Sequence, residues 1–286
     1  MNTPKINDTR KAELLSTTVE HIDITKFDAR PIVDAMGKMS FTSRDTAPGG
    51  TGLPPASGPL GRLRNRVLTV ASQRWLLRPA HRAAQTMLDA LGLPPLPVFV
   101  LDSAALADRL IVPTIPEFEY PRTDLPAHVR FVGAVTPERT ERFVMPAWWP
   151  ELFRGRPVVH VTQGTIDNAD LGRLIAPTIA ALADEDVTVV VTTGGRPLQM
   201  LPDPLPDNVF VAEFIPHDVL LPHVDVMVTN GGYGAVQRAL LDGVPLVVAG
   251  NTEDKPEVAA RVAWCGAGID LKTGTPSAAA VRRAVR

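Results

Sequence analysis

The chain has 286 residues, 45% of them apolar, with a formal net charge of −2 and a single cysteine. At about 100–200 residues per domain, this length predicts about two domains, each able to bury a core of its own. The near-neutral charge provides no basic field for nucleic acid, and the apolar content argues against wholesale disorder. These numbers therefore indicate a globular protein and disfavour a nucleic-acid-binding one.

The lone Cys265 leaves no partner for an internal disulfide or a paired-cysteine zinc site, which is typical of a reducing compartment. No stretch approaches the ~18 consecutive apolar residues that a membrane helix needs. Residues 1–15 are too polar to contain the apolar core of a signal peptide. We therefore expect a cytoplasmic protein without a transmembrane segment or a cleaved leader, whose sequence does not indicate an oligomeric state.

The amino-terminal part changes in texture along the chain. Residues 1–47 are polar and mixed, with a helix expected only at Thr9–Thr18, and residues 48–59 are so rich in Gly and Pro that they predict a linker or long loop. From residue 60 to 91 the apolar residues recur at helical spacing, and we expect Pro79 to kink or divide this run. Short apolar runs then predict strands at Pro97–Leu101, Leu110–Val112 and Val129–Val135.

The carboxy-terminal part, from Pro157 onward, repeats an apolar run, a Gly-bearing turn and a helical segment. Val-rich runs that are apolar on both faces are typical of a parallel sheet covered by helices, and the alternation implies right-handed crossovers. We therefore predict a doubly wound α/β domain. The expected strands are Val158–Val161, Val187–Thr192, Val209–Phe214, Val224–Val228, Leu246–Ala249 and Gly268–Leu271, and the expected helices are Leu171–Ala183, Ala235–Leu241 and Pro256–Trp264.

Three turns of this domain carry the candidate ligand contacts, because ligands of such sheets bind beyond the carboxyl ends of the strands. Residues 162–165 offer a glycine and a threonine hydroxyl, and the Gly-rich residues 229–235 open a helix whose free N–H groups and dipole suit a phosphate. The adjacent carboxylates of Glu253 and Asp254 can accept hydrogen bonds from sugar hydroxyls. The sequence thus predicts a phosphate seat and a polyol seat on one rim.

Each of these signals has a structural alternative. A Gly-rich turn after a strand also serves tight strand-to-helix packing, and Glu253 or Asp254 can cap the following helix. A dinucleotide-binding oxidoreductase is a further alternative, since an acidic residue follows Gly234 at the expected distance. However, Gln237 stands in place of the third glycine, and the turn follows the fourth strand of the domain rather than the first. A non-catalytic nucleotide-binding module also remains open.

Four motifs in order resemble the donor-binding signature of family 1 glycosyltransferases. They are Phe214-Ile215-Pro216-His217, Val228-Thr229-Asn230-Gly231-Gly232-Tyr233-Gly234, Gly243-Val244-Pro245-Leu246 and Glu253-Asp254-Lys255. The likeness is strongest to actinobacterial natural-product enzymes, similar to UDP-glucuronosyltransferases, and covers about residues 60–286. It implies the glycosyltransferase B fold, with two Rossmann-like domains. We then expect an incomplete acceptor-binding domain at 60–150 and a nearly complete nucleotide-sugar-binding domain at 151–286.

On the nucleobase side, the resemblance implies that Phe214 stacks on the base and that Ile215 contributes backbone contacts. His217 takes the place of a polar residue near the base and ribose. Arg238 stands where the signature often has a ribose-binding Glu, and arginine cannot accept a hydrogen bond from a ribose hydroxyl. The nucleotide that the protein prefers is therefore left open.

On the phosphate and sugar side, the resemblance implies that Gly164 and Thr165 lie beside the diphosphate. Asn230 replaces a diphosphate-binding His but keeps a hydrogen-bond donor. Asp254, next to Glu253, matches the acid that binds hydroxyls of the donor sugar. The turn whose amides hold the diphosphate corresponds to Gly231, Gly232, Gly234 and Ala235.

The activity implied by the resemblance is inverting transfer of a sugar from a nucleoside-diphosphate sugar to a hydroxyl of a small, largely apolar acceptor. It requires no metal or cofactor, because the amides of the Gly-rich helix can hold the charge of the leaving group. A base must take the proton of the acceptor hydroxyl, and in this family it is a His in the first loop of the acceptor domain. None of the six histidines matches it, so the catalytic residue is left unassigned.

The first residues resemble another family. The stretches His21–Pro31 and Asp34–Ser40 are similar to the beginning of deoxyhypusine synthase-like proteins, over about residues 11–47. This resemblance implies that residues 1–47 are a foreign segment that contributes nothing to the glycosyltransferase fold, and that the chain alone has little or no activity. The alternative is a genuine extension that brings His21 to the acceptor cleft. Arg286 lies where the family usually continues into closing helices.

Overall fold

The computed structural model describes residues 32–34, 39, 41–135 and 140–286. The chain divides into two compact units, an amino-terminal unit within Thr18–Val135 and a carboxy-terminal unit that contains Thr136–Arg286. The helix expected at Thr9–Thr18 and the residue His21 lie outside the described residues.

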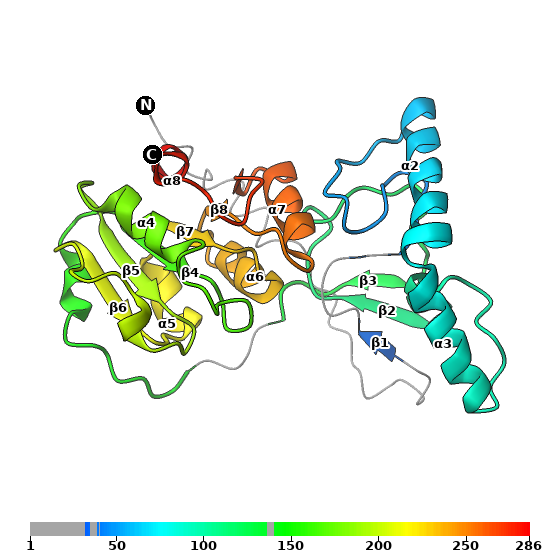
Figure 1. Cartoon of the computed structure of the whole chain (residues 1–286), viewed down its shortest axis with the longest axis horizontal. Coiled ribbons are helices and arrows are strands. Elements are labelled where there is room, and N and C mark those ends of the chain that lie inside the picture. The colour runs from blue at the N-terminus through cyan, green and yellow to red at the C-terminus, as the bar shows by residue number, and fades with distance from the viewer. Residues whose placement is uncertain (1–31, 35–38, 40, 136–139) are drawn as a thin grey trace. The chain divides into compact units, whose positions relative to one another are not determined.

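The amino-terminal unit contains two consecutive helices and a parallel sheet (Figure 1). Helix α2 (Pro59–Ala71) passes through a π-helical segment (Ser72–Leu76) into α3 (Arg78–Ala90). Pro79 is in the first turn of α3, where its missing N–H removes no helical hydrogen bond. The helical run is therefore divided just before Pro79, as predicted. The sheet has the order β1-β2-β3, with β1 at Ile32–Asp34, β2 at Arg109–Val112 and β3 at Val129–Phe131.

The strand predicted at Pro97–Leu101 is wrong. This stretch leads into a 3₁₀ helix at Val100–Leu106, and the prolines at and before position 97 remove donors that a sheet ladder needs. The side chain of Gln85 bonds the main chain of Leu96 instead, and the ring of Phe99 stacks on His81 at 5.2 Å between centroids. The apolar residues here thus pack on α3 rather than in a sheet.

Residues 39 and 41–46 belong to the amino-terminal unit. Strand β1 pairs with β2, and Met39 and Phe41 are both buried. The expectation that the first 47 residues contribute nothing to the fold is therefore wrong for these positions. The core that Met39 and Phe41 join consists of Leu110, Val112 and Val129.

The charged side chains of Asp45 and Arg122 hold this segment in place. The carboxylate of Asp45 accepts hydrogen bonds from the N–H and hydroxyl of Thr123, both at 2.6 Å, and from Arg62 at 3.0 Å. Burial pushes the pKa of Asp45 up, but these hydrogen bonds outweigh it and hold the pKa below its usual value. Arg122 donates to the main-chain oxygen of Phe41 at 2.9 Å, with its guanidinium carbon 4.7 Å from the centre of the Phe41 ring.

The Gly- and Pro-rich run that follows forms an irregular loop. The amide of Ala56 donates to the main-chain oxygen of Asp45 at 2.8 Å. Asn65 of α2, which is fully buried, donates to the main-chain oxygens of Arg44 and Ala56. The loop is thus tied both to residues 44–45 and to the first helix.

The carboxy-terminal unit is built on six parallel strands in the order β6-β5-β4-β7-β8-β9 (Figure 1). All six predicted strands are confirmed, with ends that differ by at most two residues from the expected ones. The strand predicted at 209–214 is two residues shorter than expected: it ends at Ala212, so Phe214 lies outside the sheet. The strands are β4 (Val158–Thr162), β5 (Thr188–Thr192), β6 (Val209–Ala212), β7 (Val226–Thr229), β8 (Leu246–Val248) and β9 (Gly268–Asp270).

The three predicted helices of this unit are present as α4 (Ile175–Leu182), α6 (Tyr233–Leu241) and α7 (Lys255–Trp264). Helix α4 begins later than Leu171, because the side-chain oxygen of Gln163 accepts from the N–H groups of Leu174 and Ile175, both at 3.1 Å. The sequence did not predict α5 (His217–Leu220), α8 (Ala278–Val285) or the 3₁₀ turns at Trp149–Phe153, Leu198–Met200 and Leu221–His223.

The sheet buries both of its faces. On one face, alternate strand residues such as Val159, Val161 and Val189 pack with Ile175 of α4 and Val281 of α8. The intervening residues point to the other face, where the ring of His160 meets α5. This arrangement confirms the predicted doubly wound α/β architecture.

Residues 140–150 lie with the carboxy-terminal unit, although the expected domain boundary was at 150/151. The indole N–H of Trp148 donates to the main-chain oxygen of Val211 on β6 at 3.1 Å, and its ring packs on Phe210. Thr140 donates from its N–H and its hydroxyl to the carboxylate of Asp218. These contacts place the boundary near residue 136, in agreement with the division into units.

We expect Phe41→Ala to lower the free energy of unfolding of the full chain by about 3–5 kcal/mol, because it empties a buried site in the core. The control is Leu60→Ala, whose side chain is 84% exposed and which should change stability by about 0.5 kcal/mol or less. Urea unfolding followed by circular dichroism measures both. Equal small effects would contradict a role of this segment in the fold.

Candidate functional site

The candidate site lies at the carboxyl edge of the six-stranded sheet. Strands β4 and β7 are neighbours, and the chain runs outward from them in opposite directions, so the strand order reverses between them. The crevice at such a reversal is where doubly wound sheets bind ligands. The two loops that follow these strands are joined there by Asn230, which donates from Nδ2 to the main-chain oxygen of Gln163 at 2.5 Å.

The Gly-rich turn after β7 forms the amino end of α6, as predicted. Gly231 has a φ of 89°, and a Cβ there would lie 2.7 Å from Val248, so this glycine is required for packing. Gly232 is the residue before the first helical turn, and its N–H points to Oδ1 of Asn230 at 3.4 Å. Gly234 and Ala235 then lie in the first turn of α6, whose N–H groups have no acceptor within the helix.

The loop after β4 brings the predicted Gly164 beside this turn. Gly164 has a φ of 71°, and a Cβ there would lie 3.8 Å from Oδ1 of Asn230. The next residue, Thr165, is exposed. The buried Asn168 holds the loop by donating to the main-chain oxygens of Gly164 and Thr193, at 2.8 and 2.9 Å.

The predicted base platform follows β6 at the same edge. Phe214 is 60% exposed, whereas its neighbour Ile215 is 2% exposed and anchors the loop in the core. His217 is the first residue of α5. An exposed aromatic ring next to a buried anchor is a suitable surface for stacking on a flat ligand.

Two histidine rings meet between β4 and α5. His160 of β4 is fully buried, and its ring centroid lies 5.9 Å from that of His217 in an edge-to-face arrangement. Its Nδ1 is 3.1 Å from the main-chain oxygen of Val190, which requires the proton on that nitrogen, and Nε2 has no hydrogen-bond partner among the described residues. Burial holds the pKa of His160 down at about 3, with a smaller contribution from the charge of His217.

His217 is also disfavoured as a cation. Burial lowers its pKa, and the positive charge of Arg238 lowers it further, against the opposing effects of Asp242 and Asp218. Arg238 itself donates from Nε to Oδ2 of Asp242 at 2.9 Å, one turn along α6. Arg238, which stands where the signature often has a ribose-binding Glu, is therefore engaged in an ion pair with Asp242.

The predicted acidic pair lies between β8 and α7. Asp254 immediately precedes α7, but its side chain makes no capping hydrogen bond, contrary to the alternative in which it caps this helix. Glu253 has a φ of 53°, a left-handed backbone conformation that residues other than glycine rarely adopt. Its carboxylate pairs with the ammonium of Lys255.

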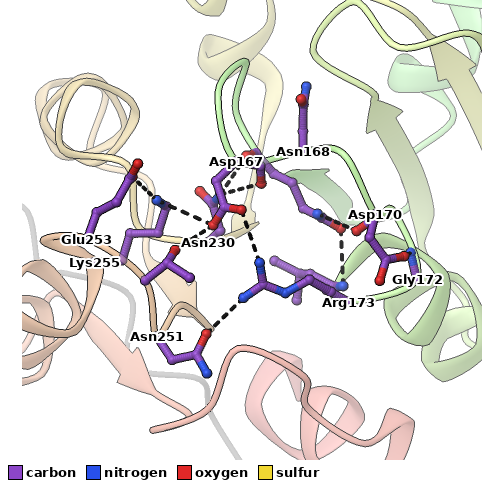
Figure 2. Close-up of polar contacts among 12 residues, drawn as sticks. Asp167, Asn168, Asp170, Gly172, Arg173, Asn230, Asn251, Glu253 and Lys255 are labelled. Atoms are coloured by element: carbon purple, nitrogen blue, oxygen red, sulfur yellow. Dashed lines mark hydrogen bonds and ion pairs between the residues drawn. The ribbon is translucent and has the colours of Figure 1, made fainter.

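A polar network that the sequence analysis missed connects this acidic loop to the loop after β4 (Figure 2). Asp167 accepts from the hydroxyl of Thr252 at 2.5 Å and from Arg173 at 3.0 Å, and its Oδ2 is 3.4 Å from the ammonium of Lys255. Arg173 also donates to the side chain of Asn251 at 2.8 Å. Asp167 stands two residues after the predicted Gly164–Thr165 turn, so extending that turn by two residues would have included it.

The structure thus brings together, at one edge, the predicted residues of the β4, β7 and β8 loops, and places Phe214, Ile215 and His217 at the end of β6 on the same edge. In the described part of the chain, no three His, Cys, Asp or Glu side chains are grouped so that they could hold a metal ion. None of the described helices is both long and apolar enough to span a bilayer.

Sequence comparisons give consistent matches. Residues 176–286 match the family described as "Erythromycin biosynthesis protein CIII-like, C-terminal domain". The chain is 55% identical over 247 residues to 4'-demethylrebeccamycin synthase of Lentzea aerocolonigenes, which covers 86% of this chain and 58% of that protein. It is 44% identical over 255 residues to UDP-glycosyltransferase 2 of Phaeomoniella chlamydospora, with 85% and 55% covered. The chain therefore spans a little over half the length of these relatives.

A solved structure also matches. The crystal structure of the glycotransferase of kitacinnamycin is 25% identical and superposes with a TM-score of 0.61. The match covers 79% of this chain and 58% of that one.

Buried His160 leads to a prediction about acid stability. In the unfolded chain its pKa returns to about 6.5, so between about pH 6.5 and pH 3 the unfolded state binds more protons than the folded one. The stability that neutral His160 contributes is complete above pH 6.5 and falls by about 1.4 kcal/mol per pH unit below it. We expect His160→Phe to flatten the decline between about pH 6.5 and 4.5, measured by urea unfolding. An unchanged slope would contradict the burial of a neutral imidazole.

Proposed function

This chain belongs to the family 1 glycosyltransferases and has their α/β B fold, and we propose that its carboxy-terminal unit binds a nucleoside-diphosphate sugar as the donor. The proposed reaction is transfer of the sugar, with inversion, to a hydroxyl of a small and largely apolar acceptor. The name of the 4'-demethylrebeccamycin synthase supports a natural product as the acceptor class. The catalytic base stays unassigned among the described histidines.

The single observation that carries this proposal is the meeting of three loops at the reversal of strand order. The side chain of Asn230 binds the β4 loop through the main chain of Gln163, and Asp167 of that loop binds Thr252 of the β8 loop. A ligand in this crevice can contact all three loops at once. A diphosphate flanked by a base and a sugar has the length and the alternating chemistry that such a row of contacts suits.

The diphosphate is proposed to lie at the amino end of α6. The N–H groups of Gly234 and Ala235 have no acceptor in the helix, and the helix dipole favours negative charge at this end. As the bond between sugar and diphosphate breaks, the negative charge on the leaving group grows, and these amides stabilise it without a reorganisation of solvent. The space beside Gly234 is open, since even a Cβ there would contact nothing within 4 Å, so the protein leaves room for a phosphate next to these amides.

The base and the sugar are proposed to lie on either side of the diphosphate. Phe214 offers an exposed ring for the base. His217, three residues further along the chain, is held neutral and can donate a hydrogen bond to the base or ribose, or accept one from it. Glu253 and Asp254 offer carboxylate oxygens for the hydroxyls of the sugar. On this arrangement Arg238 remains bound to Asp242 and takes no part in binding ribose.

The acceptor is proposed to bind to the amino-terminal unit, in keeping with the domain at about 60–150 that the sequence indicates. The helical stretch of that unit, residues 59–90, carries many exposed apolar side chains, such as Leu63, Val67 and Trp75. Residues 1–31, including His21, lie outside the described residues, so no role is proposed for them. A base within hydrogen-bond reach of the acceptor hydroxyl is what the transfer still requires.

The dinucleotide-binding alternative has a specific observation against it. In place of the third glycine of that motif, Gln237 puts a side chain that is only 7% exposed on the buried side of α6. A dinucleotide motif uses that glycine for close packing of helix and strand. The strand order alone is shared by both classes and does not distinguish them.

Isothermal titration tests the donor site. We expect UDP or dTDP to bind, and Phe214→Ala to weaken binding by about 1–3 kcal/mol, because stacking of a base on an aromatic ring contributes that much. Phe153→Ala is the matched control, because Phe153 is equally exposed (62%) but lies against His223, before β7 and therefore at the opposite edge of the sheet. Binding of neither nucleotide would overturn the proposal, and preferential binding of NAD would favour an oxidoreductase.

Asp254→Asn tests the sugar seat. We expect it to weaken binding of UDP-glucose about tenfold while leaving binding of UDP nearly unchanged, because the lost acceptor bonds only the sugar hydroxyls. The control Asp207→Asn removes an exposed carboxylate just before β6, at the opposite edge of the sheet, and should change neither affinity. Equal losses for the two ligands would show that Asp254 has another role.

A further inference from the structure

The side chain of Asp167 connects two loops that are 85 residues apart in the sequence. Its Oδ2 accepts from the hydroxyl of Thr252, and its Oδ1 accepts from Arg173, which in turn reaches Asn251 (Figure 2). These contacts attach residues 251–252 of the β8 loop to the loop after β4. The hydrogen bond from Thr252 is the main reason that the pKa of Asp167 is lowered, and burial opposes it.

Lys255 extends the connection to the acidic pair. Its side chain is only 5% exposed, so its ammonium needs carboxylate partners, and it finds them in Asp167 and Glu253. Glu253 is held by this pairing in a left-handed backbone conformation that is unfavourable by itself. The loop from 252 to 255 thus keeps its shape through contacts that converge on Asp167.

We propose that Asp167 is a positioning residue for the sugar part of the donor, acting through Thr252 and Lys255 on the loop that presents Glu253 and Asp254. This inference rests on the proposed function, because it assumes that a nucleotide sugar occupies the site. Asp167 itself need not touch the sugar. Its effect is to keep the two carboxylates of the next loop at fixed places along the crevice.

The topology predicts that this effect is confined to the sugar. The proposed base platform follows β6, which is separated from β4 by β5, and the diphosphate turn follows β7. Asn230, which binds the β4 loop, does so through the main-chain oxygens of Gln163 and Asp167, and these remain when the Asp167 side chain is removed. Loss of that carboxylate therefore disturbs the β8 loop and leaves the base and diphosphate contacts in place.

The test compares Asp167→Ala with Asp170→Ala in the full chain. Asp170 lies in the same loop and carries the same charge, but it is exposed, and among the described residues its carboxylate accepts a hydrogen bond only from the main-chain N–H of Gly172 within its own turn. Titration with UDP and with UDP-glucose measures the advantage that the sugar confers. We expect Asp167→Ala to reduce that advantage about tenfold with little change for UDP, and Asp170→Ala to preserve both affinities. A general loss of structure would instead lower both affinities together.

Thr252→Val provides a second, milder variant, because it removes only the hydroxyl donor and keeps the volume of the side chain. It should reduce the advantage of the sugar in the same direction. Combining Asp167→Ala with Asp254→Asn should cost less than the sum of the two separate losses, because both changes act on the same loop. Additive losses would overturn the proposal.

Hydrogen exchange of the ligand-free protein separates this inference from the proposed function. We expect the amides of residues 251–255 to exchange faster in Asp167→Ala than in Asp170→Ala or the unsubstituted chain. Unchanged exchange, or an unchanged advantage of UDP-glucose over UDP, overturns the positioning role. If the unsubstituted chain binds neither UDP nor UDP-glucose, the proposed function and the sugar role both fail, and faster exchange would then support only the tie between the loops.

Discussion

The hydrogen bond from Asn230 to the main chain of Gln163 is the contact on which the arrangement of the site depends. A parallel sheet that reverses its strand order leaves two loops diverging at the reversal, and their buried polar groups must find partners. In the β7 loop, the side chain of Asn230 supplies a partner: it donates to the main chain of Gln163, and its Oδ1 also faces the N–H of Gly232 at the start of α6. In the β4 loop, the side chain of Gln163 supplies one, because its oxygen accepts from the first N–H groups of α4. Two buried amide side chains therefore set where both helices begin.

The glycines of the site fall into two groups with different physical reasons. A Cβ at Gly250 would lie 1.9 Å from the main-chain oxygen of Asn230, and one at Gly231 would meet Val248, so these positions are dictated by the packing of loop against loop. At Gly234 a Cβ would meet nothing, so packing does not explain that glycine. The open space at Gly234 is compatible with the diphosphate seat proposed above. The packing explanation of a Gly-rich turn therefore accounts for Gly231 and Gly250, but not for Gly234.

The sequence predicted those features that depend on neighbours in the chain. The local pattern of Val-rich runs and Gly-bearing turns predicts a parallel sheet and the edge at which it binds ligands. The strands of the carboxy-terminal unit agree with that pattern. The contacts of Asp167 could not be predicted this way, because Thr252 is 85 residues distant and no pattern specifies the pairing. The burial of Phe41 could not be predicted from the sequence for a related reason. Its neighbours Asp45 and Arg44 look like a solvated surface, and only the fold supplies the partners that allow Asp45 to be buried.

All candidate donor residues lie between Thr162 and Lys255, on loops of a single sheet, and no residue before position 140 contributes to that set. The candidate donor-binding loops are therefore encoded in one uninterrupted stretch within the carboxy-terminal unit. Recombination that replaced the chain before Thr140 would leave the hydrogen bonds between these loops intact. On the proposed function, such a fold would allow the acceptor-binding and the donor-binding parts to diverge separately.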